Sequence, residues 1–410
     1  MKQKPQSQDN KPCWGLLPEQ IRSRIRRREW DNFPSLKARL LGTKGFPIRI
    51  GLKPPDGSSA ILNMDHFQKF VQEWKSFHHQ DLVQWSVKNY RDLSEQDIPI
   101  FVVIGSIQDL IRFLGDKALS RSRLWECNML PVLQLDQNLY PALVKHLDMV
   151  ENLSSRDAEL LAQLLPQLKP SLGTGLYLRA LPLVGVDTKF LEKYLVLIEE
   201  LTDTIHKGKV FESNGFLKWL DCIPHPKGFA QGVPIVRPLC LTSREQLGGF
   251  PMMQIPSDIL RENELPALNI IVVENVESGL ALPEMDNTVA VIGGGKNVAW
   301  MDASWLKNKR VGYWGDIDTW GFSILSDVRS KLAEVEPLMM DIETIKMHEG
   351  RMVPEPEHVG SVPVLLTNDE ANLFNDLISD HFLSSRLEQE RLSSDYICDK
   401  LKKWLSLYNS

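Results

Sequence analysis

Two carboxylates, Asp316 and Asp318, leave the end of a short apolar strand just before a predicted helix at 320–332. Successive side chains of a strand alternate between its faces, so these two residues point to the same side. A second apolar stretch, 268–273, has the pattern of a buried parallel strand and ends on Glu274. In an open α/β sheet, ligands bind outside the carboxyl ends of the strands, so we expect the three carboxylates to converge there.

The chemistry that such a site predicts is hydrolysis of a phosphodiester. Carboxylate oxygens select Mg²⁺ or Mn²⁺, which can bind a phosphate oxygen, activate water and stabilise the charge that develops during in-line displacement. We expect Asp316 and Asp318 to hold the metal, and Glu274 to complete the coordination or accept the proton of the attacking water. No nucleotide cofactor is required. An isolated Asp-x-Asp turn is usually a solvated loop, but here the acidic positions terminate apolar strands, which favours a metal site.

Other catalytic motifs are incomplete. The run Gly293–Lys296 invites a phosphate-loop interpretation, but Ala290 stands where that motif needs glycine and Asn297 stands where it needs a hydroxyl. A glycine turn after a strand is the better interpretation. No His-Glu-x-x-His and no Gly-x-Ser-x-Gly pattern occurs, which argues against a zinc hydrolase and a serine hydrolase.

Length and composition predict a soluble protein of two or three domains. The chain has 410 residues, of which 43% are hydrophobic and 24% charged, and no apolar run reaches the roughly 18 residues of a membrane span. The polar stretch 1–11 lacks the apolar centre of a signal peptide, so we expect a bacterial cytoplasmic location and no membrane contact. The five cysteines are scattered without a Cys-x-x-Cys pair, which suggests neither a zinc site nor a disulfide framework.

Positive charge is concentrated at the N-terminus. Residues 1–53 hold thirteen Lys and Arg against four Asp and Glu, so this segment carries +9 while the whole chain carries −6. The densest part comprises Arg22, Arg24, Arg26, Arg27 and Arg28. Such a cluster can bind DNA phosphates or an acidic partner surface, and it can equally be a solvated helix face. The sequence leaves these alternatives open.

Periodicity divides the chain into three parts, with boundaries at 1–90, 91–256 and 257–410. The first part is predicted as an α+β arm and the second as a mostly helical region with short strands. The predicted elements are helices at 17–30 and 65–74, an edge strand at 46–52, helices within 82–165, a strand at 176–183, a helix from 188 to 205, and a strand at 235–239. A stretch rich in glycine and proline, 248–256, marks the main boundary.

The third part alternates strands with helices, which predicts an α/β domain with a parallel sheet and flanking helices. Its strands are expected at 268–273, 288–292, 311–314 and 337–340. Thr367 and Glu370 form a capping-box pattern at the start of a helix, and 394–407 is predicted as a terminal amphipathic helix.

The C-terminal third resembles the Toprim domain of the JetD family, the nuclease subunits of the bacterial Wadjet plasmid-defence system, equivalent to the MksG nucleases of condensin-like Mks systems. Four segments carry this resemblance: 272–275, 313–321, 338–341 and 386–390. Further matches, listed here in chain order, extend it over nearly the whole chain: Phe46–Pro47, Arg179, Leu181–Pro182 and Gly185–Phe190. Their order and spacing together are more specific than any one of them.

The resemblance implies an N-terminal arm, a middle region similar to the winged-helix domain of the topoisomerase VI A subunit, and a Toprim domain. It implies a homodimer that brings two metal centres to opposite strands of duplex plasmid DNA, and an SMC-type complex with kleisin and kite subunits that presents the DNA. The family's metal ligands carry over as Glu274, Asp316 and Asp318. Asp341 matches a further family position, as a ligand or as a structural strand-end carboxylate. Arg179 and Lys189 become candidates for binding DNA or a partner.

Two other functions remain as alternatives. A topoisomerase-like transesterase needs a tyrosine nucleophile in the middle region, where Tyr140, Tyr177 and Tyr194 lie. None of the three stands in an arginine- and tyrosine-rich motif, and Tyr194 falls on an apolar helical stripe, so hydrolysis is favoured. A non-catalytic DNA-binding or assembly subunit is the second alternative, and the intact set of three carboxylates argues against it.

Overall fold

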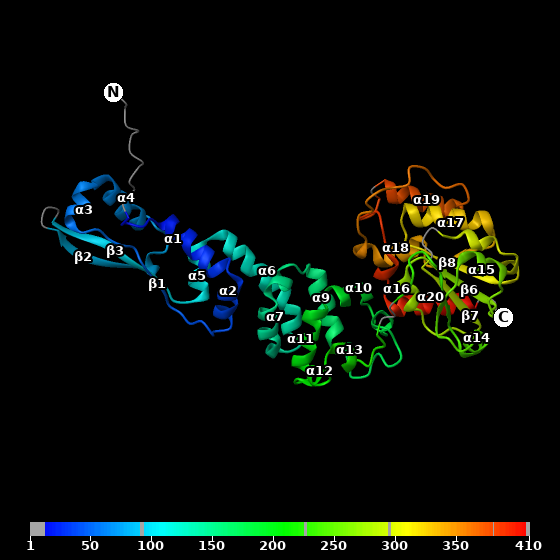
Figure 1. Cartoon of the computed structure of the whole chain (residues 1–410). Helices are drawn as coiled ribbons and strands as arrows, with labels where there is room; N and C mark the ends of the chain where they lie inside the picture. The colour runs from blue at the N-terminus through cyan, green and yellow to red at the C-terminus, as the bar shows by residue number, and fades with distance from the viewer. Residues whose placement is uncertain (1–12, 91–93, 225–227, 294–296, 380, 407–410) are drawn as a thin grey trace, which may run out of the picture. The chain divides into compact units, whose positions relative to one another are not determined.

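The computed structural model describes residues 13–90, 94–224, 228–293, 297–379 and 381–406. The chain divides into two compact units, Met1–Glu159 and Leu160–Ser410 (Figure 1). The division falls inside helix α9, between the boundaries that the sequence predicts at 90 and 256. Among the described residues, no helix is long and apolar enough to cross a membrane.

The first unit contains a three-stranded antiparallel sheet with the order β1-β3-β2. Its strands are β1 (Ile48–Gly51), β2 (Val83–Tyr90) and β3 (Ser94–Ile104). The predicted edge strand at 46–52 is confirmed by β1. The hairpin of β2 and β3 is not among the predicted elements. The side chain of Val87 in β2 is 65% exposed, so apolar residues do not mark a single buried face of this strand.

Helices make up the rest of the first unit. The predicted helix at 65–74 is confirmed, and its Phe67, Phe70 and Trp74 are buried core residues. The predicted helix at 17–30 is present, but its second half, Arg26–Trp30, is a π-helical turn, η1. The helices are α1 (Pro18–Ile25), α2 (Phe33–Leu40), α3 (Gly57–Leu62), α4 (Met64–Lys75), α5 (Ile107–Leu114), α6 (Asp116–Leu133), α7 (Tyr140–Lys145), α8 (Leu147–Glu151) and the first half of α9 (Ser155–Leu164).

The second unit begins with a helical part. The strand predicted at 176–183 is wrong: this segment forms only a short 3₁₀ turn, η5 (Leu178–Ala180). Pro182 lacks the backbone N–H that a strand ladder requires, and Leu181 and Leu183 are buried without strand pairing. The predicted helix from 188 to 205 is interrupted at Tyr194. The helices are α10 (Thr188–Lys193), α11 (Leu195–Ile205), α12 (Lys209–Glu212) and α13 (Phe216–Trp219).

A six-stranded sheet with the order β5-β4-β7-β6-β8-β9 is the framework of the second unit. Strands β7, β6, β8 and β9 are parallel, which confirms the predicted parallel α/β arrangement, and β4 and β5 add antiparallel pairs. The strand predicted at 235–239 is confirmed, and it pairs with β7 in this sheet. The strands are β4 (Ile235–Pro238), β5 (Met253–Gln254), β6 (Asn269–Val273), β7 (Thr288–Ile292), β8 (Arg310–Trp314) and β9 (Glu336–Pro337).

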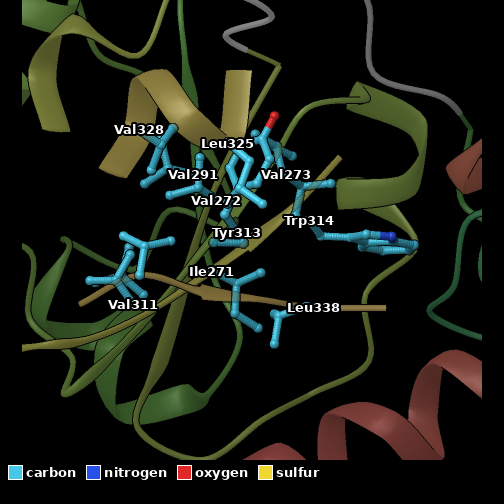
Figure 2. Packing of buried hydrophobic residues seen from close by; sticks show 14 of the residues in the cluster. Ile271, Val272, Val273, Val291, Val311, Tyr313, Trp314, Leu325, Val328 and Leu338 are labelled. Carbon is cyan, nitrogen blue, oxygen red and sulfur yellow. The ribbon is translucent and has the colours of Figure 1, made fainter. Parts of the chain in front are cut away.

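Helices cover this sheet. Figure 2 shows Leu325 and Val328 of α17 in one buried cluster with Val272 and Val291 of the central strands. The predicted helices at 320–332, after the capping box at Thr367, and from Ser394 are confirmed; Leu407, the predicted end of the last, lies outside the described residues. The helices are α14 (Leu241–Gln246), α15 (Ser257–Glu262), α16 (Val276–Leu280), α17 (Thr319–Lys331), α18 (Ile342–His348), α19 (Asn368–Ile378) and α20 (Ser394–Ser406).

Candidate metal centre

The ends of β6 and β8 bring two of the predicted carboxylates to one edge of the sheet. These strands are parallel neighbours in which Val273 pairs with Trp314. The backbone N–H of Glu274 then donates to the carbonyl oxygen of Trp314, 3.0 Å away. Glu274 therefore begins where β6 ends, beside the segment that leads from β8 to Asp316. This is the edge at which ligands bind in open α/β sheets.

Asp316 and Asp318 share a face because Ile317 between them is committed to the other side. Ile317 is buried and exchanges two backbone hydrogen bonds of 2.9 Å with Leu387. Asp318 is also the N-cap of α17, since its Oδ1 accepts a hydrogen bond from the backbone N–H of Gly321 at 2.7 Å. The predicted same-side arrangement of the two aspartates is therefore consistent with the backbone.

Gly321 allows α17 to start this close to the aspartates. A Cβ atom at position 321 would lie only 2.0 Å from the backbone oxygen of Asp316. Any larger residue would push the first turn of the helix away from the strand end. The glycine in the Asp-x-Asp-x-x-Gly run is thus a requirement of the local packing.

The three carboxylates interact strongly with one another. Burial, followed by the negative charges of Asp316 and Asp318, raises the pKa of Glu274 to about 7. Burial is also the main cause that raises the pKa of Asp318 to about 6 and raises that of Asp316. Carboxyl groups held together in this way resist ionisation unless a positive charge lies between them.

That positive charge is supplied by Arg386, a residue to which the sequence analysis assigns no contact. Its guanidinium lies 2.6 Å from Oδ2 of Asp316 and 3.1 Å from Oδ2 of Asp318. Three residues further on, the backbone N–H of Gln389 donates to Oδ1 of Asp316 at 2.8 Å. The segment Arg386–Glu390, called the 386–390 strap below, therefore holds both aspartates.

The strap is itself anchored to the helical part of the second unit. Lys189 pairs with Glu388 at 2.6 Å and with Glu390 at 3.1 Å, and Arg179 pairs with Glu390 at 2.6 Å. Although burial opposes ionisation, these cations lower the pKa of both glutamates. The structure thus places Arg179 and Lys189 in ion pairs within the chain. Their expected contact with DNA or a partner stays a prediction.

A fourth carboxylate, Glu355, lies beside the site and is not among the residues predicted from the sequence. Its buried side chain accepts hydrogen bonds from the hydroxyl of Thr319 at 2.7 Å and from the backbone N–H of Thr319 at 3.3 Å, and His358 lies 2.8 Å away. It fastens the loop that contains it onto the first turn of α17. No local sequence pattern marks Glu355, since its partner lies 36 positions away.

Asp341 and the glycine run lie at other places. Asp341 caps α18, where its Oδ1 accepts hydrogen bonds from the backbone N–H and the hydroxyl of Thr344. Its role as a metal ligand stays a prediction. In the glycine run, Gly293 follows β7 with a φ of 77°, as a turn glycine does, whereas 294–296 lie outside the described residues.

The five arginines of the N-terminal cluster fall into two groups. Arg22 and Arg26 donate to the backbone oxygens of Phe113 and Leu114, at 3.2 and 3.4 Å, and so satisfy carbonyl groups at the end of α5. The other three, Arg24, Arg27 and Arg28, have exposed side chains. Only this second group is free to meet an external anion.

The donor set of the predicted site suits a hard divalent cation, because it consists of carboxylate oxygens. Across the described part of the chain, however, no three His, Cys, Asp or Glu side chains are arranged to hold a metal ion as they stand. Asp316 and Asp318 instead share the guanidinium of Arg386. A divalent cation would have to take over these contacts.

Comparison with known proteins gives two matches along the chain. Residues 18–203 match a family described as an uncharacterized protein conserved in bacteria, N-terminal part. Residues 228–401 match the family described as Wadjet protein JetD, C-terminal. No curated protein matches the chain. The C-terminal part of the chain therefore belongs to the family of the Wadjet protein JetD, and the two matches, which together cover most of the chain, are consistent with the JetD family.

Proposed function

We propose that this chain is the nuclease subunit of a Wadjet or Mks defence system, and that it hydrolyses phosphodiester bonds of circular duplex DNA with Mg²⁺ or Mn²⁺. The observation that carries the proposal is the convergence of Glu274, Asp316 and Asp318 at the ends of neighbouring strands, with the pKa of Glu274 raised to about 7 and that of Asp318 to about 6. Membership of the JetD family supports the assembly with other defence subunits.

In this proposal Asp316 and Asp318 bind the metal, and Glu274 completes the site or accepts a proton. The cation would neutralise phosphate charge and activate water for hydrolysis. The chain's own residues provide the rest: Gln389 orients Asp316 through its backbone N–H, and Gly321 lets Asp318 hold its place at the start of α17. Arg386 balances the aspartates' charge and gives up its contacts when the cation binds.

The larger assembly follows from the same proposal. Residues 257–410 form a Toprim domain, the region before it includes a winged-helix-like part, and two copies act together so that each cuts one strand of the duplex. An SMC-type ATPase with kleisin and kite subunits presents plasmid DNA in the bacterial cytoplasm.

The decisive experiment compares closed circular plasmid with the same plasmid made linear. Each is incubated with the purified protein, with and without Mn²⁺, and with and without the products of the neighbouring genes. We expect Mn²⁺-dependent cleavage of the closed circle that is lost in a chain carrying both Asp316→Asn and Asp318→Asn. Equal cleavage by wild type and this double variant would refute the metal-site assignment.

A further inference from the structure

A groove runs between the first helical segment and β1 in the first unit. Its volume is about 460 Å³, and four of its lining residues are cations: Arg24, Arg28, Arg49 and Lys53. We refer to it as the basic groove. Ile25, Ile48 and Ile50 add apolar surface. The groove therefore combines an apolar lining with a concentration of positive charge.

The cations of the basic groove are available to a ligand. Arg24, Arg28 and Lys53 are exposed, and within the described part of the chain no carboxylate pairs with them. Glu29 also lines the groove, but it is already bound by Arg39 and Lys44 at 2.8 Å each. Although burial opposes this, those two cations and Ser35 lower the pKa of Glu29 to about 2. Glu29 therefore does not neutralise the groove.

Arg49 is held in position. Its guanidinium lies 3.9 Å from the ring centroid of Phe101 on the neighbouring strand, and it makes a long contact of 3.5 Å with Gln84. Stacking of this kind restricts a side chain that would otherwise be mobile, so less entropy is lost when an anion binds. Arg49 is thus preorganised on β1.

The backbone of β1 offers a second type of contact. β1 is an edge strand that pairs with β3, and within the described residues no strand pairs with its other side. The backbone N–H of Leu52 donates to Ile100, so by alternation Ile48 and Ile50 also face β3. The N–H and C=O groups of Arg49 and Gly51 therefore point away from the sheet, as an unsatisfied edge does.

We propose that the basic groove binds an extended acidic segment of a partner protein, which adds to β1 as a further strand and places its carboxylates against Arg24, Arg28, Arg49 and Lys53. Backbone hydrogen bonds to the strand edge supply affinity, and the charges supply specificity. DNA phosphates could bind the same cations, but a DNA duplex cannot pair with the free edge of β1 as a further strand. A peptide can, and it is therefore the favoured ligand. This surface is independent of the metal chemistry proposed above.

The test uses the full chain and a short fluorescein-labelled peptide of alternating glutamate and valine, followed by fluorescence anisotropy at low salt. We expect saturable binding that the double change Arg24→Glu and Arg28→Glu weakens by about tenfold or more, because attraction becomes repulsion at two contacts. Arg27→Glu is the matched control: it lies in the same segment, is exposed, and does not line the groove. One such reversal outside the groove should change the affinity by less than about threefold.

Two further measurements identify the mode of binding. A peptide N-methylated at alternate residues keeps its charge but cannot form the edge hydrogen bonds, and it should bind much more weakly. Hydrogen exchange should show protection of the Arg49 and Gly51 amides when the unmodified peptide is bound. The proposal is overturned if the peptide does not bind, if the groove variant binds it like wild type, if the β1 amides stay unprotected, or if a short DNA duplex protects β1 and the peptide does not.

Discussion

Arg386 and Asp316 form an ion pair of 2.6 Å across 70 positions of the sequence, and this pair joins the 386–390 strap to the end of β8. The same guanidinium reaches Asp318 at 3.1 Å. An internal cation therefore lies where the proposed function requires a divalent one. Because Arg386 contacts both aspartates, a bound divalent cation would have to displace its guanidinium. Competition between Arg386 and the metal can therefore be measured in variants of these residues.

Asp318→Asn should reduce Mn²⁺-dependent cleavage by more than about a hundredfold. Loss of a residue that only hydrogen-bonds a metal ligand costs up to about a hundredfold in activity, and loss of a ligand itself should cost more. Asparagine keeps an oxygen that can accept the N–H of Gly321, so the cap of α17 and the melting temperature should be retained. Cleavage is followed on closed circular plasmid in the reconstituted complex. Asp56→Asn, which changes the N-cap of α3 in the other unit, is the control and should cleave like wild type. Asp341→Asn in the same assay decides whether Asp341 is a ligand.

Glu274→Gln should stabilise the protein in EDTA at pH 8 and have little effect near pH 4. The folded-state pKa of Glu274 is raised to about 7, so its protonated form favours folding at low pH, and this contribution is lost as pH rises through about 7. Glutamine keeps the neutral form at every pH. A shift of the pKa from 4.5 to about 7, at about 1.4 kcal/mol per pKa unit, predicts a gain at pH 8 on the order of 3 kcal/mol. Equal unfolding free energies of the two proteins at both pH values would show that folding does not raise the pKa of Glu274.

Arg386→Gln should lower the melting temperature in EDTA, because it leaves Asp316 and Asp318 without their cation, at a cost of roughly 1–3 kcal/mol. Adding Mn²⁺ should then raise the melting temperature more in the variant than in wild type, since the metal no longer competes with the guanidinium. Arg310→Gln removes another arginine–carboxylate pair of the same sheet, that with Glu336, and serves as the control, which should show the same Mn²⁺ response as wild type. A smaller Mn²⁺ response in Arg386→Gln than in wild type would mean that Arg386 helps to hold the metal.

Arg179→Gln should destabilise the second unit without weakening DNA binding. Its side chain is 14% exposed and bridges Glu192 and Glu390. The change removes this cation from both carboxylates, although Glu390 keeps Lys189, at a cost on the order of 2 kcal/mol. Chemical denaturation measures the stability, and anisotropy of a labelled duplex in EDTA measures the affinity. A folded variant with clearly reduced DNA affinity would support the DNA contact that the sequence predicts for Arg179.

The strands that carry the site could be predicted from the sequence because each has a local hydrophobic pattern. Strands β6, β7 and β8 are short runs of apolar residues buried on both faces, and such runs are recognisable without knowing their partners. The position of Asp316 and Asp318 after β8 then follows from alternation. The contact of Arg386 with these aspartates could not be predicted, since Arg386 lies 70 positions away and nothing in the local spacing indicates which carboxylates it contacts.

The same distinction applies to the N-terminal arginines. Composition identifies the cluster, but whether a given arginine meets solvent or a carbonyl group depends on where α5 ends. Arg22 and Arg26 contact that end, and Arg24 and Arg28 line the basic groove instead. The hairpin of β2 and β3 was missed for a different reason: its strands are adjacent in the sequence, but an exposed valine, Val87, blurs the alternation of β2.

Tyr313→Phe should leave strand cleavage within about tenfold of wild type, with no protein attached to the DNA ends. Tyr313 lies beside the proposed metal site, with its hydroxyl 3.5 Å from Oε2 of Glu274. Burial, followed by the charge of Glu274, raises its pKa well above the usual value, so the hydroxyl stays protonated and is a poor nucleophile. The corresponding Phe variants of Tyr140, Tyr177 and Tyr194 test the remaining candidates for transesterification. Denaturing electrophoresis of labelled DNA after cleavage gives the answer: a covalent adduct that disappears in any one of these four variants would replace hydrolysis by tyrosine chemistry and identify its nucleophile.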